Sequence, residues 1–381
     1  MIKLCCAVLL LAGATARKAD KTDKIIEGTE LLLTFLVHRH GDRTPIAETL
    51  VFSNNPDKLA ELSAPYGYGQ LTTVGKRRSY ELGKFIRKRY DGFIARQFNR
   101  SEIFIRSTDS TRAKMTILSA LAAIYPPVKK VFRGLDWTPV PYSNVPAKYD
   151  FNMPFANCPN FMNDYRQLLS TTSPAILNYS YAVSLLSNIT GLDMFQNSGY
   201  IYAVYDVYTS QVSLGLPLEP KIQAVWPDVE AAAGIAIGLV NGNETLLPYQ
   251  AGVLLSKFYD AVSEVTTGDT SRMRIYSAHD FNVYSFQAVT KIVNKQGVPK
   301  YNSAYALELR RNVHTGELVV VPVYLPSPGQ DPIYLEIEGC GSVCNYNDFV
   351  AITSEYALDE DTWRTKCGFT SDLVIDSSSF A

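Results

Sequence analysis

The chain has 381 residues, enough to bury a large core, which indicates one big domain with an insertion or two domains. Lys plus Arg (36) nearly balances Asp plus Glu (37), and 46% of the residues are hydrophobic. This balance excludes a global field that attracts nucleic acid or anionic membranes, so any anion site must be local.

The first residues have the pattern of a cleaved secretory leader. Lys3 precedes an apolar run at 4–12 and a small-residue exit at 14–16. This run and the later apolar run at 231–240 are both too short to span a bilayer, so no membrane span is expected. We predict a signal peptide at 1–16 and an exported mature protein, with lysosomal delivery as an alternative destination.

Three apolar segments predict buried strands, and each is followed by a helical pattern. The strands are expected at 31–37, 101–107 and 274–277. The helices are expected at 70–90, from about 110 to 124, and at 281–293. Two alternating segments around the turn His314-Thr315-Gly316 predict a hairpin, at 304–310 and 317–324. The recurrence of strand, loop and helix indicates an α/β core.

A change of composition marks an insertion in this core. Between about 146 and 268 the chain becomes rich in Tyr, Asn and Ser, with helical patches such as 249–265. We predict a mostly helical cap at 146–268, inserted between two parts of the α/β core at 22–145 and 269–381.

Cleavage of the leader would remove Cys5 and Cys6 and leave an even set of cysteines, which are Cys158, Cys340, Cys344 and Cys367. An oxidising compartment favours disulfides, and three pairings are possible. A zinc site is not expected, because no CxxC or clustered histidine accompanies these cysteines. Export also makes N-glycosylation sequons meaningful. They lie at Asn99, Asn178, Asn188 and Asn243.

Charged residues stand where the three predicted strands end. The first strand leads into Arg39-His40-Gly41-Asp42-Arg43-Thr44-Pro45, the second reaches Arg106, and the third ends at His279-Asp280. Ligands of open α/β sheets bind beyond the carboxyl ends of the strands. We therefore expect these side chains to converge on one composite site.

The expected ligand of this site is a small phosphomonoester. Arg39, Arg43 and Arg106 suit a dianionic phosphate, because a guanidinium group matches its oxygens in a bidentate fork. His279 would donate a hydrogen bond to the phosphoryl group during transfer. This cage requires neither a metal nor another cofactor.

The same set of residues predicts the chemistry. Surrounded by cations, His40 should resist protonation and attack phosphorus in acid, which gives a phosphohistidine. Asp280 would give a proton to the leaving alcohol and then, as carboxylate, help water attack the intermediate. That proton requirement predicts an acidic optimum.

In order and spacing, these motifs resemble those of the histidine acid phosphatases. RHGDRTP at 39–45, RST at 106–108 and SAHD at 277–280 carry the resemblance. It extends over most of the chain through GQLTTVG (69–75), YELGKFIRKRY (80–90), WTPVPYSNVP (137–146) and GCGSVC (339–344). The chain is most similar to the secreted prostatic, lysosomal and venom types of animals. The resemblance implies a Rossmann-like α/β core with a mostly parallel sheet, an α-helical cap, a metal-free phosphohistidine mechanism and often a homodimer.

The resemblance assigns the same roles to the same residues. It makes His40 the nucleophile and Asp280 the proton donor, with phosphate bound by Arg39, Arg43, Arg106 and His279. It implies disulfides between Cys158 and Cys367 and between Cys340 and Cys344. Two departures concern cap rigidity and substrate range: the third disulfide of mammalian relatives has no counterpart, and Ser143 stands where they often carry a histidine.

Other functions use part of the same pattern. A phytase or a lipid-phosphate phosphatase would share the core, and the cap would decide between them. An exported binding protein without turnover is disfavoured by the intact His40, Arg106 and Asp280. A phosphoglycerate-mutase-type transferase usually lacks the secretory leader and the His-Asp dipeptide.

Several single residues have plainer interpretations. His38 and Asp42 could be imagined as metal ligands, but the adjacent arginines would repel a cation. We expect His38 at the edge of the core and Asp42 as an orienting partner of a neighbouring arginine. An HD-type metal phosphohydrolase would need more ligands than His314, which is expected in a solvated turn. The basic run at 76–89 is expected to be a solvated helix face, not a nucleic-acid patch.

Overall fold

The computed structural model describes residues 21–129, 132–171 and 173–375, and within them eight strands form one mixed sheet. The strands are β1 (Thr29–Arg39), β2 (Ile103–Ser107), β3 (Ser143–Asn144), β4 (Met273–Ala278), β5 (Ala304–Asn312), β6 (Leu318–Leu325), β7 (Ile333–Tyr334) and β8 (Cys344–Asn345). Their order is β3-β2-β4-β1-β5-β6-β7, with β8 paired to β6. The predicted signal peptide, with Cys5 and Cys6, lies outside the described residues.

The strands that carry the predicted site residues are parallel. β1 pairs with β4, β4 with β2, and β2 with β3, all in parallel register, whereas β5 to β8 pair antiparallel. Arg39 lies opposite Ala278, and Ser107 lies opposite Ser277. The carboxyl ends of β1, β2 and β4 therefore meet at one edge of the sheet. The α/β fold and the β5–β6 hairpin expected from the sequence are confirmed.

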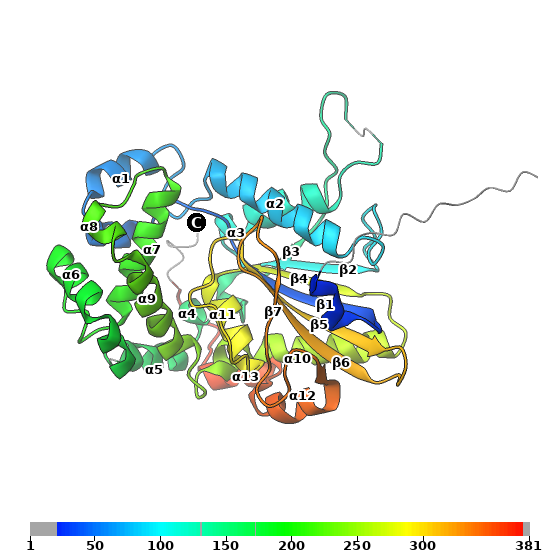
Figure 1. Cartoon of the computed structure of the whole chain (residues 1–381). Helices are drawn as coiled ribbons and strands as arrows, with labels where there is room; N and C mark the ends of the chain where they lie inside the picture. The colour runs from blue at the N-terminus through cyan, green and yellow to red at the C-terminus, as the bar shows by residue number, and fades with distance from the viewer. Residues whose placement is uncertain (1–20, 130–131, 172, 376–381) are drawn as a thin grey trace, which may run out of the picture.

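Two helices cover one face of the sheet, α2 (Thr73–Arg89) and α3 (Thr111–Ile124) (Figure 1). The Thr72 side chain caps α2 by accepting a hydrogen bond from the Gly75 backbone N–H. The two helices approach closely at Gly83, where a Cβ atom would lie 2.1 Å from the Ala120 carbonyl oxygen. Their apolar faces and that side of the sheet enclose one core cluster, which includes Leu36, Leu82 and Ile117.

The other face is covered by α10 (Leu247–Thr266) and α11 (Asp280–Val289), with α12 (Tyr346–Thr353) and α13 (Glu360–Cys367) beyond them (Figure 1). Aromatic rings join these helices to the sheet. The Phe35 ring of β1 lies 5.8 Å from that of Phe258 on α10 and 5.5 Å from that of Phe286 on α11. All three side chains are fully buried.

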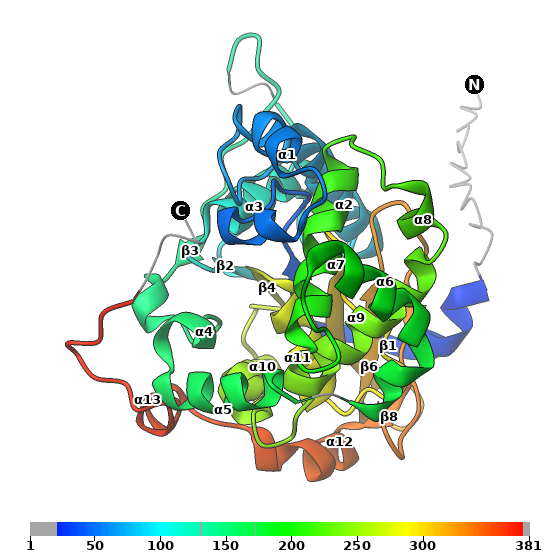
Figure 2. The same cartoon turned by 90° about the vertical axis from the view of Figure 1, so that its left-hand side faces the viewer.

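A helical unit lies across the carboxyl edge of the sheet, and Figure 2 shows α7 and α9 in front of that edge. The longer helices in this part of the chain are α5 (Pro159–Leu169), α6 (Ser180–Thr190), α7 (Gly199–Ser213) and α9 (Trp226–Asn241). The short ones are η2 (Ala47–Phe52), α1 (Pro56–Ser63), η3 (Ala147–Tyr149), α4 (Pro154–Asn157), η4 (Pro174–Tyr179) and α8 (Pro220–Gln223). The remaining 3-10 helices are η1 (Lys21–Ile26) and η5 (Ser354–Tyr356).

Packing divides the chain differently from the predicted cap at 146–268. Helix α10 lies inside that range, yet its buried residues belong to the sheet core with Phe35 and Phe286. Leu59 and Phe52 lie outside the range, yet they join the core of α6, α7 and α9. Helix α10 packs on the sheet because one of its faces is an apolar stripe that matches Phe35 and the aliphatic side chains of β1.

The structure contains the two disulfides that the family resemblance implies. Cys158, between α4 and α5, is bonded to Cys367 at the end of α13, across 209 residues of chain. Cys340 is bonded to Cys344 across 4 residues. The long bridge ties the first helices after β3 to the C-terminal helix. In the described part of the chain, no helix is long and apolar enough to cross a membrane.

Replacing Cys158 and Cys367 together by serine should lower the free energy of unfolding by about 2–4 kcal/mol, because the bond restricts a long loop of the unfolded chain. The matched double variant, Cys340→Ser with Cys344→Ser, opens only a short loop and should lose less. Urea unfolding followed by circular dichroism measures both variants. An equal or larger loss for the short loop would contradict the prediction.

Candidate active site

The loop after β1 holds His40 through backbone contacts to three other segments. The His40 N–H donates to the Ala278 carbonyl oxygen at 2.9 Å, and the His40 carbonyl oxygen accepts from the Asn302 N–H at 3.1 Å. The Gly41 N–H donates to Thr116 Oγ1 on α3 at 2.9 Å. The end of β4, the approach to β5, and α3 therefore fix the position of this histidine.

Two glycines allow α2 to pack directly on this loop. A Cβ atom at Gly75 would lie 2.1 Å from the Asp42 carbonyl oxygen, and one at Gly41 would lie 2.8 Å from the Gly75 carbonyl oxygen. Any side chain at either position would push the loop away from the helix. The glycine of the RHGDRTP run is thus needed for close approach of two backbones.

The His40 side chain is held in one tautomer. Its Nδ1 lies 2.9 Å from the Gly41 carbonyl oxygen, and a carbonyl can only accept a hydrogen bond. In the neutral ring Nδ1 therefore carries the hydrogen and Nε2 carries the lone pair. The His279 ring lies edge-on to the His40 ring, with 5.3 Å between centroids.

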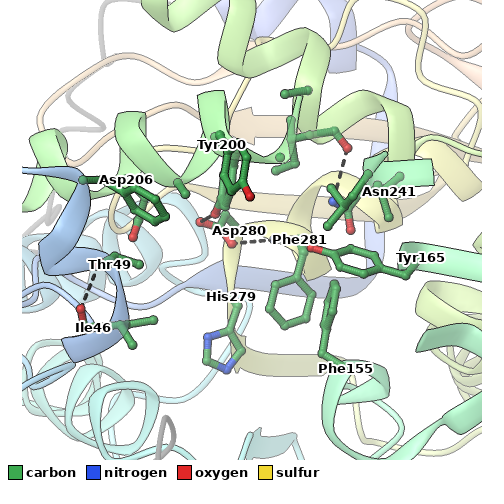
Figure 3. Close-up of a pocket in the computed structure, with 18 of the residues that line it drawn as sticks. Ile46, Thr49, Phe155, Tyr165, Tyr200, Asp206, Asn241, His279, Asp280 and Phe281 are labelled. Atoms are coloured by element: carbon green, nitrogen blue, oxygen red, sulfur yellow. Dashed lines mark hydrogen bonds between the residues drawn. The ribbon is translucent and has the colours of Figure 1, made fainter. Parts of the chain in front are cut away.

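His40 opens into a cavity of about 430 Å³ between the sheet edge and the helical unit. Its charged and titratable lining comes from four parts of the chain, and consists of His40, Arg43, Arg112, Asp206, His279 and Asp280. Figure 3 shows Asp206, Asp280 and His279 facing this space together with several aromatic rings. The loop after β1, α3 and the N-terminus of α11 thus meet α7 at one point.

Asp206 of α7 binds the arginines of the loop. Arg43 Nη2 donates to both carboxylate oxygens of Asp206, at 2.9 and 2.7 Å, and Arg39 Nη2 lies 3.4 Å from one of them. The Arg39 guanidinium also stacks over the Tyr301 ring at 4.3 Å and donates to the Pro299 carbonyl oxygen at 2.7 Å. Every one of these groups is buried.

Asp280 is the first residue of α11 and shares the same network. Its Oδ2 accepts from Arg39 Nη2 and from the Tyr202 hydroxyl, both at 2.7 Å. Its Oδ1 accepts from the Phe281 backbone N–H at 2.8 Å. A helix N-terminus favours a carboxylate, and the three donors fix the orientation of this one. Arg39 therefore lies behind Asp280 and Asp206, in contact with both.

Burial and positive charge act together on the two histidines. Burial lowers the pKa of His40 well below its ordinary value, and Arg112, Arg39 and Arg43 lower it further. Burial and the same arginines lower the pKa of His279. Arg112 shares in this crowding, because burial and the neighbouring Arg43 lower its own pKa to about 9. Burial and the arginines therefore both favour the neutral form of the two imidazoles.

Comparison with known proteins agrees with this geometry. The profile of the histidine phosphatase superfamily (branch 2) matches residues 30–190. The chain is 30% identical to bovine (Bos taurus) prostatic acid phosphatase over 394 aligned positions, which cover 97% of this chain and 99% of the relative. It is 29% identical to rat (Rattus norvegicus) lysosomal acid phosphatase, with coverage of 92% and 83%. The chain belongs to the histidine acid phosphatases.

Solved structures of other proteins have the same fold as this histidine acid phosphatase. The phytase from Citrobacter braakii superposes with a TM-score of 0.64 at 13% sequence identity, and the match covers 87% of this chain and 99% of the phytase. At this identity the likeness concerns the fold alone.

Two arginines that were predicted to bind phosphate, Arg39 and Arg106, are absent from the lining of the cavity in this histidine acid phosphatase. Arg106 does not line the cavity; it donates to Asp150 at 2.7 Å and stacks over the Phe151 ring at 4.3 Å. Residues along a strand alternate between the two faces of the sheet, and Arg106 shares its face with Phe104. Its side chain therefore lies against one face of the sheet and does not extend past the strand end.

Arg112 lines the cavity instead, from the first turn of α3. The sequence signal for it was the helix start directly after the second strand, since such a helix N-terminus also meets the carboxyl edge of the sheet. Asp206 and Tyr202 were missed as well. Both lie on α7, in a Tyr-rich segment that matches no catalytic motif. They belong to the site only because that helix packs over the loop.

The positions of His38, Asp42 and His314 can also be compared with those expected from the sequence. His38 is completely buried, in the core and not at its edge, and its Nδ1 donates to the Arg39 carbonyl oxygen at 3.1 Å. Asp42 pairs with a neighbouring arginine as expected, and this arginine is Arg78 of α2, at 2.7 Å. His314 is exposed in the predicted turn. Among the described residues, no cluster of His, Cys, Asp or Glu has the arrangement of a metal site.

The sequons are accessible to different degrees. Asn99, Asn178 and Asn188 are exposed, and Asn243 is half-buried. Their glycosylation stays a prediction.

Replacing Asp206 by asparagine should lower the free energy of unfolding by about 3 kcal/mol, because it leaves Arg43 and Arg39 buried without this countercharge. Chemical denaturation measures the loss. The matched control is Glu61→Gln, which breaks an exposed pair with Lys58 and should cost less than about 0.5 kcal/mol. Equal effects of the two variants would contradict a structural role for the buried pair.

His38 should make stability depend on pH. Burial lowers its pKa from 6.5 to about 4, so between these values the unfolded chain binds more protons than the folded chain. Stability therefore falls as the pH falls through this window, and His38 should contribute a loss of about 1.5 kcal/mol between pH 6.5 and 5. Unfolding of His38→Gln at both pH values should show a smaller drop than the parent. The control His314→Gln should keep the parent's slope, and an unchanged slope in His38→Gln would count against the prediction.

Proposed function

We propose that this histidine acid phosphatase is an exported enzyme whose His40 forms a phosphohistidine, with Asp280 as proton donor and without a metal. Membership of the family makes the chain a phosphoric monoester hydrolase. The observation that carries the mechanism is the tautomer of His40: its Nδ1 faces the Gly41 carbonyl oxygen, which leaves the lone pair on Nε2. That nitrogen is a nucleophile beside several fixed cations.

In the first step, Nε2 of His40 attacks phosphorus while the bond from phosphorus to the ester oxygen breaks. Asp280 transfers a proton to that oxygen, so the product leaves as an alcohol. In the second step, Asp280 takes a proton from water as the water oxygen attacks phosphorus and the bond to Nε2 breaks. Phosphate leaves, and both side chains return to their starting forms.

Arg43, Arg112 and His279 would bind the phosphoryl oxygens, since all three line the cavity with His40. Arg112 takes the role that the sequence assigned to Arg106. Arg39 would act from the next layer, because its guanidinium contacts Asp280. In a phosphoryl transfer the negative charge spreads over the equatorial oxygens, and preorganised donors stabilise it there.

The depressed pKa of His40 supports activity in acid. Since burial and the arginines keep the imidazole neutral, the nucleophile persists at a pH where a solvent-exposed histidine is protonated. The leader-like segment at 1–16, the two disulfides and the exposed sequons support export to an oxidising compartment, either secretion or delivery to a lysosome.

The test is turnover in mild acid with a chelator present. His40→Ala should lose at least about 10³-fold in kcat, because no nucleophile remains. Asp280→Asn should lose about 10²–10⁴-fold with an alkyl phosphate and much less with 4-nitrophenyl phosphate, whose leaving group needs no proton. Chelator should leave the parent rate unchanged.

An alkaline quench of the parent during turnover of radiolabelled substrate should preserve labelled phosphohistidine, which is stable in base. Loss of activity with chelator, or parental kcat in His40→Ala, would refute the mechanism. A uniform effect of Asp280→Asn on both leaving groups would refute the proton-donor role alone.

A further inference from the structure

The part of the cavity away from His40 has a different chemical character from the catalytic end. Its walls come from the loop and η2 on one side, from α4 and α5 on another, and from α7 and α9 on a third. These walls are mostly apolar, and include Ile46, Phe52, Phe155, Leu169, Ile237 and Val240. A leaving group bound at His40 has to lie against them.

One wall is an aromatic cluster that continues from the catalytic residues. The Phe281 ring stacks on the His279 ring, with 5.1 Å between centroids, and the Phe155 ring lies 4.4 Å from Phe281. Tyr165 lies 5.1 Å beyond Phe155. Figure 3 shows these three rings side by side next to His279 and Asp280. The first atoms of the leaving group therefore meet aromatic faces and edges.

The opposite side of the cavity is closed by α9. Ile237 and Val240 of this helix are almost fully buried from solvent and still line the cavity. Among the described lining residues outside the catalytic end, the polar side chains are hydroxyls and amides such as Thr49 and Asn241, and none carries a charge. A second anionic group on a substrate would find no cation on these walls.

The apolar composition of these walls should favour some leaving groups over others, because it changes the free energy of binding. Apolar surface gains free energy when it leaves water for such walls, whereas a charged group loses hydration without a partner. The phosphate does not incur this loss of hydration without a partner, because Arg43 and Arg112 lie at the catalytic end.

We propose that this enzyme acts on monoesters of apolar, uncharged alcohols, alkyl or aromatic, and discriminates against substrates with a second anionic group such as inositol polyphosphates. The inference rests on the proposed function, since it concerns the leaving group of the same reaction. It assigns the specificity to Phe155, Phe281, Leu169 and the α9 wall.

The test compares leaving groups of equal reactivity. Straight-chain alkyl phosphates from ethyl to octyl should show kcat/KM rising by up to about fourfold per methylene until the cavity is filled. Hexyl phosphate should exceed 5-carboxypentyl phosphate by at least tenfold, although the two leaving alcohols have similar basicity. Inositol hexakisphosphate should be a poor substrate.

A charge-insertion variant tests the wall directly. Leu169→Lys places a cation on the cavity wall at the C-terminal end of α5, where the helix dipole favours it. It should reverse the preference, so that 5-carboxypentyl phosphate gains at least tenfold relative to hexyl phosphate. The control Gln167→Lys adds the same charge at an exposed position in the same turn and should keep the parent's preference. Phe52→Lys serves as a second wall variant if Leu169→Lys is unfolded by circular dichroism.

The outcomes distinguish failure of the proposed function from failure of the proposed leaving-group specificity. Failure to release phosphate from any monoester would refute the proposed function. Release from all of them with a flat chain-length series, or with inositol hexakisphosphate as the best substrate, would refute the specificity and leave the function standing. An unchanged preference in both wall variants would likewise overturn the assignment to these walls.

Discussion

Three guanidinium groups, those of Arg39, Arg43 and Arg112, are buried around one histidine, and such crowding of like charges is unfavourable unless carboxylates accompany it. Asp280 supplies one carboxylate from the sheet edge, and Asp206 supplies the other from α7. The helical unit is thus more than a cover for the cavity. It delivers the countercharge without which the arginines could not stay buried, so the position of α7 and the structure of the catalytic loop depend on each other.

The two ends of the cavity differ in charge because the buried arginines lie at the end that contains His40. Near His40, burial and then the arginines lower the pKa of the imidazole, and the positive charge suits a phosphate dianion. A short distance away the walls become aromatic and aliphatic, where a charge has no partner. The charged end of the cavity therefore suits the phosphate, which every substrate shares. The apolar end suits the leaving group, which differs between substrates.

The sequence predicted those parts of the fold that produce a continuous pattern of residues along the chain. Strands β1, β2 and β4 are buried on both faces, so they appear as apolar runs, and the RHGDRTP and SAHD motifs follow β1 and β4 directly. Arg106 was misplaced because adjacency to a strand end was weighed above the alternation of the strand, which turns this side chain onto the sheet face. Asp206 and Tyr202 could not be found, since their partners lie far away along the chain and only the docking of α7 brings them together.

The order in which the site residues occur along the chain has a consequence for biosynthesis. His40 leaves the ribosome early, but its loop is held by Ala278 and Asn302, and Arg43 pairs with a carboxylate 163 residues later. Contacts of such sequence separation form late, because a long loop has to close first. The nascent chain therefore has no organised site around His40 until nearly all of the polypeptide has been made. Catalytic competence should arise after translation, as a property of the completed chain.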